Sequence, residues 1–232
     1  MIPKIIHYCW FGRNILPKST KKCIASWKKY LPDYEIKEWN EDNFDVNKIP
    51  YTHDAYNAKK YAFVSDYARF WILYNYGGLY FDTDVEVIKP MDDIIAKGAF
   101  MGWERPSSLG AFSIAPGLGL AANQEEPFYK EALTSFEKLS FYKEDGTWNN
   151  YTMIPMVTDL LLQRGLKKDG SMQVIDGITF YPADYFCPMD SITGKLFITK
   201  NTYAIHWYSM SWIEPHLKYK IKIARYLKRL FI

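Results

Sequence analysis

The clearest hydrophobic pattern in the chain covers residues 62–76. Apolar and aromatic residues recur there at the three- and four-residue spacing of one helix face, which predicts a buried helix. Gly77 and Gly78 follow it, and glycine readily takes the left-handed conformation that ends a helix. The next three residues are uncharged and favour extended structure, so residues 79–81 are predicted to form a central strand.

The rest of the chain alternates between strand-like and helix-like patterns. Further strands are predicted at 2–9, 34–39 and 203–207, and further helices at 17–30, 123–136 and 153–163. Residues 102–104 are a candidate strand end, and the stretch around Pro50 is predicted to be a loop. Strands that alternate with helices favour an α/β fold with a mostly parallel central sheet flanked by helices.

Length and composition limit the kind of protein this can be. The 232 residues are enough for one substantial core, so we expect a single domain over 1–232. The formal net charge of +3 does not suggest a protein that binds nucleic acid. The 19 tyrosines and 8 tryptophans exceed the needs of a core, although most are expected to lie there. Cys9, Cys23 and Cys187 show no metal-binding or disulfide spacing and are expected to be free thiols.

Acidic side chains follow the predicted strand at 79–81. In extended chain, Asp82 and Asp84 would point the same way, with Thr83 facing elsewhere. Two such carboxylates suit Mn²⁺ or Mg²⁺, although an Asp-x-Asp sequence is also common in solvated turns. On the preceding helix, Asp66 and Arg69 are three residues apart and share a face, and the planar guanidinium of Arg69 suits a phosphate or a carboxylate.

Two more residues are predicted to reach the same place. Trp10 follows the first predicted strand, and Asp82 follows the strand at 79–81. Because ligands bind outside the carboxyl ends of parallel strands, both are expected to line one cleft. His206 lies in the predicted strand 203–207, and its imidazole is a candidate third ligand for a metal ion, although a lone histidine is more often structural.

Several of these segments resemble a known family. Residues 65–69 and 76–84 resemble the sugar-binding region of the DXD-containing glycosyltransferases of family 32, which include capsular polysaccharide transferases and initiating mannosyltransferases. Residues 2–12 and 34–40 are similar to the family's first two strands, and residues 206–212 give a further short match. The resemblance implies a GT-A-like fold with a nucleotide-sugar-binding part at 1–120, an acceptor-side part at 121–215 and a helical tail at 216–232.

The resemblance also implies roles for individual residues. Asp82, Asp84 and His206 would bind Mn²⁺ or Mg²⁺, and Arg69 would stabilise the departing nucleotide together with the ion. The implied contacts with the nucleotide sugar involve the following residues: Trp10, Asp66, Arg69, Gly78, Tyr80, Asp82, Ser211 and Trp212. Trp10 would stack near the base, and Ser211 would donate to the diphosphate. Family members retain anomeric configuration, which implies that the departing phosphate takes the acceptor's proton.

The implied partners are a nucleotide sugar, with UDP favoured by family habit, and a saccharide or lipid-linked glycan acceptor. The resemblance further implies a role in the synthesis of capsular or other cell-surface polysaccharide. No leader or long apolar run is visible, so a cytoplasmic protein is expected. Residues 216–232 read as a basic amphipathic helix, which would either lie on the inner face of a membrane or pack on the domain.

Two other classes of protein fit parts of this pattern. A glycoside hydrolase also uses paired carboxylates but needs neither a metal nor a nucleotide. A carbohydrate-binding module without catalysis would use the same aromatic residues. Dependence of ligand binding on a divalent ion separates the transferase from both alternatives.

Overall fold

We analysed a computed structural model of the chain, which describes residues 1–106, 111–149, 151–209, 217, 219–221 and 223–225. The helices are α1 (Lys18–Tyr30), α2 (Pro50–Asn57), α3 (Tyr61–Tyr76), α4 (Asp92–Ile95), α5 (Pro127–Phe136), α6 (Met153–Gln163) and α7 (Ala183–Phe186). The strands are β1 (Ile5–Cys9), β2 (Glu35–Trp39), β3 (Gly78–Tyr80), β4 (Val85–Val87), β5 (Phe100–Glu104), β6 (Ser113–Ile114), β7 (Leu120–Ala122), β8 (Gln173–Ile175), β9 (Ile178–Tyr181) and β10 (Ala204–His206).

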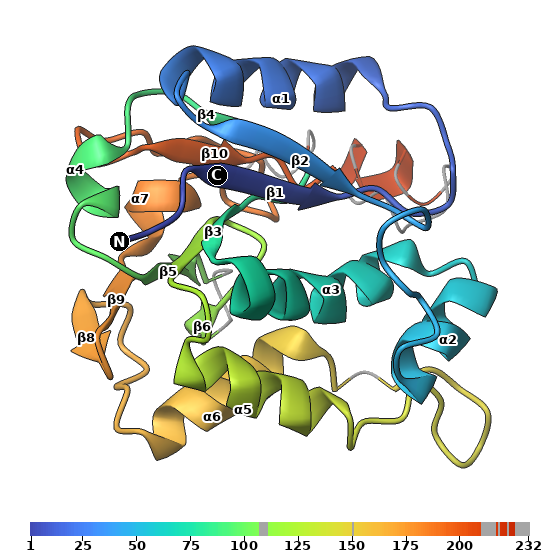
Figure 1. The fold of residues 1–232 in the computed structure, drawn as a ribbon. Helices are drawn as coiled ribbons and strands as arrows, with labels where there is room; N and C mark the ends of the chain where they lie inside the picture. Colours follow the sequence, from blue (N-terminus) through green and yellow to red (C-terminus); the bar gives the residue numbers. More distant parts are fainter. Residues whose placement is uncertain (107–110, 150, 210–216, 218, 222, 226–232) are drawn as a thin grey trace.

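A central sheet organises these elements (Figure 1). Its strand order is β2-β1-β3-β7-β5-β9-β8, with β6 beside β5, while β4 and β10 form a separate antiparallel pair. The α/β fold with a central sheet flanked by helices is confirmed. The sheet is more mixed than expected: β1, β2, β3, β5 and β9 point one way, but β6, β7 and β8 run against them. The sequence did not reveal the opposing strands because they are short.

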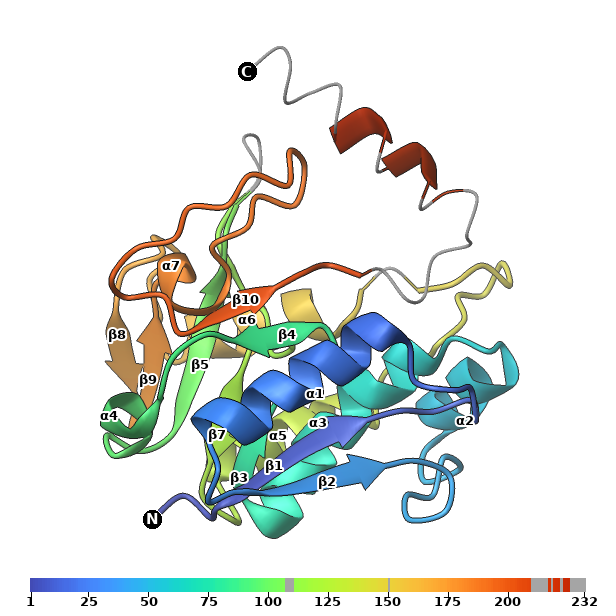
Figure 2. The same ribbon diagram turned by 90° about the horizontal axis from the view of Figure 1, so that it is seen from above.

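Helices cover both faces of this sheet, as Figures 1 and 2 show. On one face, Trp27 of α1 packs with β-strand residues that include Ile6 and Leu79. On the other face, α3, α5 and α6 enclose a core that includes Phe70 and Tyr80. Leu79 and Tyr80 are adjacent in β3 and belong to opposite cores, as the alternation of side chains along a strand requires.

Most predicted elements are present, and one prediction is wrong. The segment around Pro50 is the helix α2 and not a loop, with Pro50 as its first residue, where the missing N–H costs no hydrogen bond. Pro155 likewise lies in the first turn of α6 and does not interrupt it. The thiols of Cys9, Cys23 and Cys187 are free and buried, as expected.

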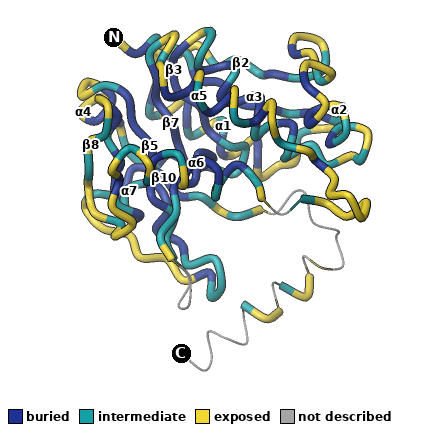
Figure 3. The backbone as a smooth tube through the Cα atoms, turned by 90° about the horizontal axis from the view of Figure 1, so that it is seen from below, coloured by how far each residue is buried: buried dark blue, intermediate teal, exposed yellow. Residues whose placement is uncertain are grey.

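The tail could be described only in part. Residues 217, 219–221 and 223–225 are helical, and the other residues of 216–232 lie outside the described part of the chain. Tyr219 and Ile223, two members of the expected apolar face, are 68% and 43% exposed. In Figure 3 the described parts of the tail are coloured as exposed or intermediate, whereas the central strands are mostly buried. None of the helices that the structure describes has the length and apolarity to cross a membrane.

Candidate active site

A cleft of about 540 Å³ opens where β1 and β3 end. Six residues singled out from the sequence line it: Trp10, Asp66, Arg69, Asp82, Asp84 and His206. Trp10 directly follows β1 and Asp82 comes shortly after β3, and the parallel pairing of these strands brings both residues to one edge of the sheet. The expectation that Trp10 and Asp82 share a cleft is therefore confirmed.

The two aspartates enter the cleft from a turn. The strand β3 ends at Tyr80, and the amide of Val85 donates to the carbonyl of Asp82 over 3.0 Å, which closes a turn through Thr83 and Asp84. The prediction that the carboxylates align because the chain is extended is wrong, and Thr83 also lines the cleft instead of facing elsewhere. The chain turns here because it passes from the central sheet to β4, which pairs with β10.

Asp82, Asp84 and His206 form a cluster of candidate metal ligands. One ligand atom from each lies within 4.8 Å of the other two. His206 ends β10, which pairs with β4, and its Nε2 atom lies 3.2 Å from Asp84 Oδ1. Backbone amides fix Asp84 as well: Trp207 donates to its carbonyl over 3.0 Å and Ser209 to its Oδ2 over 2.7 Å. The β4–β10 pair thus builds this cluster.

Arg69 joins the helix-borne acid to the turn. Its Nη2 atom lies 2.9 Å from Asp66 Oδ1 and 3.2 Å from Asp82 Oδ1, and its Nε donates to the Ser65 carbonyl over 3.1 Å. The Tyr80 hydroxyl donates to Asp82 Oδ1 over 3.2 Å. Because only 4% of the Arg69 side chain is exposed, the guanidinium is fixed in place and aligns both carboxylates.

The charges of the site are unevenly compensated. Burial raises the pKa of Asp82, and Arg69 opposes this only in part. Burial acts in the same direction on Asp84, but His206 and the hydrogen bonds from Ser209 together outweigh it and lower the pKa of that carboxyl. Burial favours a neutral His206, yet Asp84 raises the pKa of the ring. Burial raises the pKa of Asp66 to about 6 in spite of Arg69. Asp84 and His206 therefore stabilise each other's charged forms, and a bound metal ion would take the place of the His206 proton, while Asp82 lacks a full counter-charge.

This arrangement suits a divalent cation. Four carboxylates line the cleft, those of Asp66, Asp82, Asp84 and Glu104, whereas Lys59 and Arg69 are its permanently charged cations. In addition, His206 Nδ1 is buried and has no hydrogen-bond partner among the described residues. Two carboxylates and an imidazole are donors that Mn²⁺ and Mg²⁺ accept, so the residues fit such an ion.

The other residues implied by the resemblance lie at different places. Gly78 and Tyr80 do not line the cleft: Gly78 begins β3, and Tyr80 is 1% exposed behind the carboxylate that it contacts. Ser211 and Trp212 lie outside the described residues. Tyr80 thus contacts Asp82 and holds it in place, and Gly78 is not among the residues that line the cleft.

Two further residues at the site were not singled out from the sequence, although Tyr208 lies within the short match at 206–212. A Cβ atom on Gly117 would lie 1.9 Å from Asp82 Oδ2, so only glycine fits there without movement of the carboxylate. The Tyr208 ring meets the His206 ring edge-on with centroids 4.3 Å apart, and its hydroxyl donates to Glu104 Oε1 over 3.0 Å. Glu104 ends β5, which confirms the strand end expected at 102–104.

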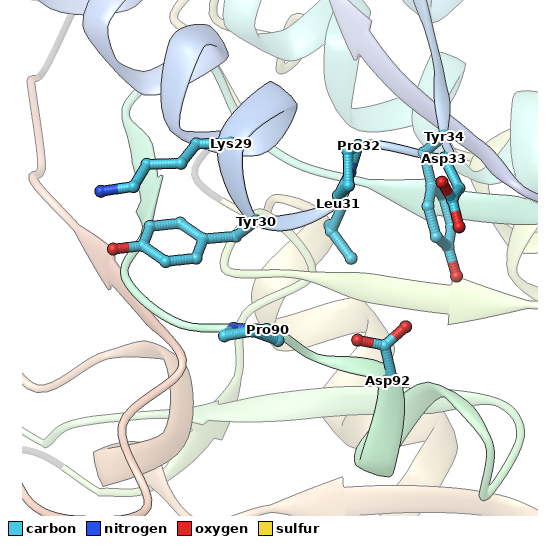
Figure 4. A pocket seen from close by; sticks show the side chains of 8 residues that line it. All are labelled: Lys29, Tyr30, Leu31, Pro32, Asp33, Tyr34, Pro90 and Asp92. Atoms are coloured by element: carbon cyan, nitrogen blue, oxygen red, sulfur yellow. The ribbon is translucent and has the colours of Figure 1, made fainter.

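A second hollow of about 320 Å³ lies between the end of α1 and the segment before α4 (Figure 4). Lys29, Tyr30 and Asp92 are among its lining residues, and it shares none with the cleft that contains Asp82. No cluster of candidate metal ligands occurs there among the described residues. We therefore place the chemistry in the larger cleft.

Comparison with known proteins identifies the segment that carries the aspartates. Residues 17–101 match the family described as the glycosyltransferase sugar-binding region containing the DXD motif. Residues 17–101 thus resemble a DXD glycosyltransferase region. Arg69, Asp82 and Asp84 lie within this DXD region, whereas Trp10 and His206 are contributed from outside it.

Two curated proteins are similar to part of this chain, and both are named for the transfer of mannose. The chain is 32% identical over 111 residues to inositol phosphoceramide mannosyltransferase 1 of Schizosaccharomyces pombe, covering 43% of this chain and 33% of that protein. It is 28% identical over 162 residues to the mannosyl phosphorylinositol ceramide synthase SUR1 of Saccharomyces cerevisiae, covering 68% and 38%. The chain thus spans between about a third and two fifths of the length of these relatives.

One solved structure resembles the fold of nearly the whole chain. It is the crystal structure of a glycosyltransferase involved in the glycosylation of the major capsid of PBCV-1, with a TM-score of 0.53. The match covers 95% of this chain and 100% of that chain at 12% identity. The likeness therefore concerns the fold, which is that of a GT-A glycosyltransferase.

Proposed function

We propose that this protein is a metal-dependent glycosyltransferase that moves a hexose or an N-acetylhexosamine from a nucleotide sugar to a saccharide or lipid-linked acceptor. The observation that carries the proposal is the cluster of Asp82, Asp84 and His206, whose ligand atoms lie within 4.8 Å of one another in the cleft of about 540 Å³. The ion is Mn²⁺ or Mg²⁺, and its role when bound is to balance the negative charge of the leaving diphosphate.

The residues of this chain have separate tasks in the proposal. Asp82, Asp84 and His206 hold the ion, and Arg69 keeps Asp82 in place through the ion pair at 3.2 Å. Trp10 lines the same cleft as the aspartates, and its ring suits a nucleobase. Asp66 presents a carboxylate to sugar or ribose hydroxyls. Ser211 and Trp212 keep the roles that the resemblance implies, contact with the diphosphate and packing over it.

The donor and the acceptor are proposed by class. UDP is the nucleotide favoured by the family, and transfer with retention of configuration follows the same resemblance. The relatives are named for the transfer of mannose to inositol phosphoceramide, so a nucleotide-linked mannose belongs among the donors to test. We place the activity in the synthesis of cell-surface polysaccharide, with the tail at 216–232 as a candidate membrane contact.

The site gives little support for a glycoside hydrolase. That reaction needs one carboxylic acid and one free carboxylate beside the scissile bond. Asp84 is engaged by His206 and Ser209, and Asp82 is engaged by Arg69 and Tyr80. Neither of these two side chains is free to exchange a proton with a substrate, so the carboxylate pair predicted from the sequence does not suit that reaction.

Thermal unfolding with a panel of nucleotide sugars tests the proposal. The panel contains UDP-linked glucose, galactose and their N-acetylated forms and GDP-linked mannose, each with Mn²⁺ and with EDTA. We expect one donor to raise Tm with Mn²⁺ and to lose that effect in EDTA, because ligand binding stabilises the folded state by mass action. An equal shift in EDTA would refute the metal site.

Substitutions test which residues the donor-dependent rise in Tm requires. Asp82→Asn and Asp84→Asn are expected to abolish the donor-dependent rise in Tm. Asp42→Asn is the matched control, since Asp42 is 67% exposed and pairs only with Arg13 on the surface among described residues. A full donor-dependent rise in the Asp84→Asn protein would contradict the assignment of this residue.

A further inference from the structure

A short loop between α7 and β10 exposes an unusual set of side chains. The 195–200 loop has the sequence Lys-Leu-Phe-Ile-Thr-Lys, and all six residues are exposed. Leu196, Phe197 and Ile198 are 37%, 40% and 56% exposed. Among the described residues, this is the one place where three large apolar side chains in succession are exposed. Figure 2 shows the loop as part of the orange segment that leads into β10.

The backbone on either side of the apolar residues is held by the fold. On one side, Leu196 bridges to Met189, and the amide of Phe197 donates to the Pro188 carbonyl over 3.0 Å. On the other side, the Thr199 hydroxyl donates to Asp184 over 2.8 Å. The exposure of the apolar side chains is therefore a property of the folded loop and not of an unfolded segment.

Basic side chains lie beside the Phe197 ring, and Lys200 follows the apolar residues in the sequence. The Lys195 ammonium lies 5.5 Å from the centroid of the Phe197 ring, and the Arg105 guanidinium lies 4.7 Å from it. Lys200 closes the loop at its other end, with its carbonyl bound by the Lys89 ammonium at 2.6 Å. Cations around apolar side chains match the headgroups and the upper acyl region of an anionic bilayer.

The loop connects both to the tail and to the cleft. Arg225 in the tail donates to the carbonyl of Ser191, just before the loop, over 2.9 Å. Arg105, which contacts Phe197, follows Glu104, and Glu104 lines the cleft. A surface that received the loop would therefore lie close to the Glu104 side of the cleft.

We propose that the 195–200 loop is a membrane-contact site, in which Leu196, Phe197 and Ile198 enter the interface of an anionic bilayer and Lys195 and Lys200 lie among its headgroups. The loop would present the Glu104 side of the cleft to an acceptor anchored in that bilayer. Only this last statement rests on the proposed function, because membrane binding itself needs neither the donor nor the metal.

Sedimentation with lipid vesicles tests the loop directly. The full chain is expected to bind vesicles that contain about 30% phosphatidylglycerol in phosphatidylcholine more tightly than vesicles of phosphatidylcholine alone. The Phe197→Ser/Ile198→Ser variant should weaken binding by about tenfold or more, because it removes apolar area from the contact. The Lys195→Ser/Lys200→Ser variant should lose the preference for anionic vesicles. Wild-type protein that does not bind either kind of vesicle would overturn the proposal.

A matched variant controls for the general loss of apolar surface. Met172 and Val174 are 49% and 64% exposed and belong to the segment around β8. The Met172→Ser/Val174→Ser variant should bind vesicles as the wild type does. Donor-dependent shifts in Tm should persist in every variant, which separates a failure of the membrane proposal from a failure of the proposed function. Equal weakening of binding in the control and the loop variant would contradict a specific site.

A fluorescent label on the loop tests whether the loop or the tail contacts the membrane. Cys9, Cys23 and Cys187 are buried, so Ile198→Cys supplies an accessible thiol for a polarity-sensitive nitrobenzoxadiazole dye. On anionic vesicles, the dye is expected to brighten and shift to the blue. A dye that stays in water while the protein binds would overturn the proposal. A wild-type dimer that becomes monomeric in the Phe197→Ser/Ile198→Ser variant would overturn it too, in favour of a second copy of the chain as partner.

Discussion

Gly117 lies directly against the carboxylate of Asp82, so close that a Cβ atom on the glycine would sit 1.9 Å from Oδ2. The same Cβ atom would lie 2.9 Å from Nη1 of Arg69. The space beside the ion pair is therefore filled by protein backbone. Gly117 also fixes the turn directly, because its carbonyl accepts a bond from the Asp82 amide over 3.2 Å.

We predict that Gly117→Ala removes the metal-dependent donor effect. The added methyl group must displace Asp82 or the backbone, with a cost in stability of about 1–3 kcal/mol, typical of overpacking. Thermal unfolding with Mn²⁺ and the best donor should show a lower Tm and no rise on addition of the donor. Gly98→Ala is the contrast, because its Cβ atom meets nothing within 4 Å while its φ of +104° strains the backbone. It should lower Tm and keep the donor-dependent rise.

Arg69 is predicted to be important for stability as well as for the site. Arg69→Met leaves Asp66 and Asp82 without their shared cation, and removal of one partner of a buried ion pair costs about 3–5 kcal/mol. Urea unfolding measures this loss. Addition of Asp66→Asn to Arg69→Met should recover part of it, since one uncompensated carboxylate is then removed. An Arg69→Met protein as stable as the wild type would contradict the bridging role.

His7 is predicted to make stability depend on pH. Trp39 donates to its Nδ1 over 3.0 Å and its Nε2 lies 3.0 Å from the Gly77 carbonyl, a pattern that only the neutral ring satisfies. Burial lowers the pKa of His7 from 6.5 to about 4, with the Gly77 carbonyl opposing the shift. Between these pH values the unfolded chain binds the proton more readily than the folded protein, so stability falls as the pH drops from about 6.5 toward 4.

The size of this effect and its test follow from the pKa shift. The loss contributed by His7 amounts to about 3 kcal/mol over that pH range. Urea unfolding at a series of pH values should show a smaller loss for His7→Gln, because the amide side chain does not titrate. Parallel pH profiles for the two proteins would show that His7 is not the group responsible.

Tyr208 is predicted to position the His206 ring. Tyr208→Phe keeps the edge-on ring contact and loses the hydroxyl bond to Glu104, so Mn²⁺ affinity should change little. Tyr208→Ala removes the ring and should weaken Mn²⁺ binding by about 10- to 100-fold, as is usual when a residue that orients a ligand is lost. Calorimetric titration with Mn²⁺ compares the variants. Equal weakening in both would assign the effect to the hydroxyl group.

The fold was predictable from the sequence where structure is local. The helix α3 has a continuous apolar face and a glycine stop, so the expected range of 62–76 differs from the observed Tyr61–Tyr76 by one residue. The helix α2 is not evident from the sequence because proline occurs both in loops and in the first turn of a helix, and here Pro50 begins the helix. The strands from β6 to β9 span only two to four residues each and show no alternation long enough to detect.

The sequence predicted the residues of the site that belong to a recognisable motif. Asp82 and Asp84 stand out in the sequence, but the turn that aligns them depends on β4 and its pairing with β10, a contact between distant segments. Gly117 and the Tyr208 hydroxyl, which binds Glu104, gained their roles through such contacts, and the short match at 206–212 did not single out Tyr208. The charge balance of Asp82 likewise depends on burial, which the motif alone does not reveal.

The pairing of β4 with β10 also has a consequence for the synthesis of the protein. Asp84 is bound by Ser209, which lies 125 positions later in the chain. A nascent polypeptide on the ribosome therefore carries both aspartates long before it carries the histidine that accompanies them. Until translation has passed β10, the growing chain lacks His206, the third of the proposed metal ligands, and a product that ended before β10 would not contain the complete cluster.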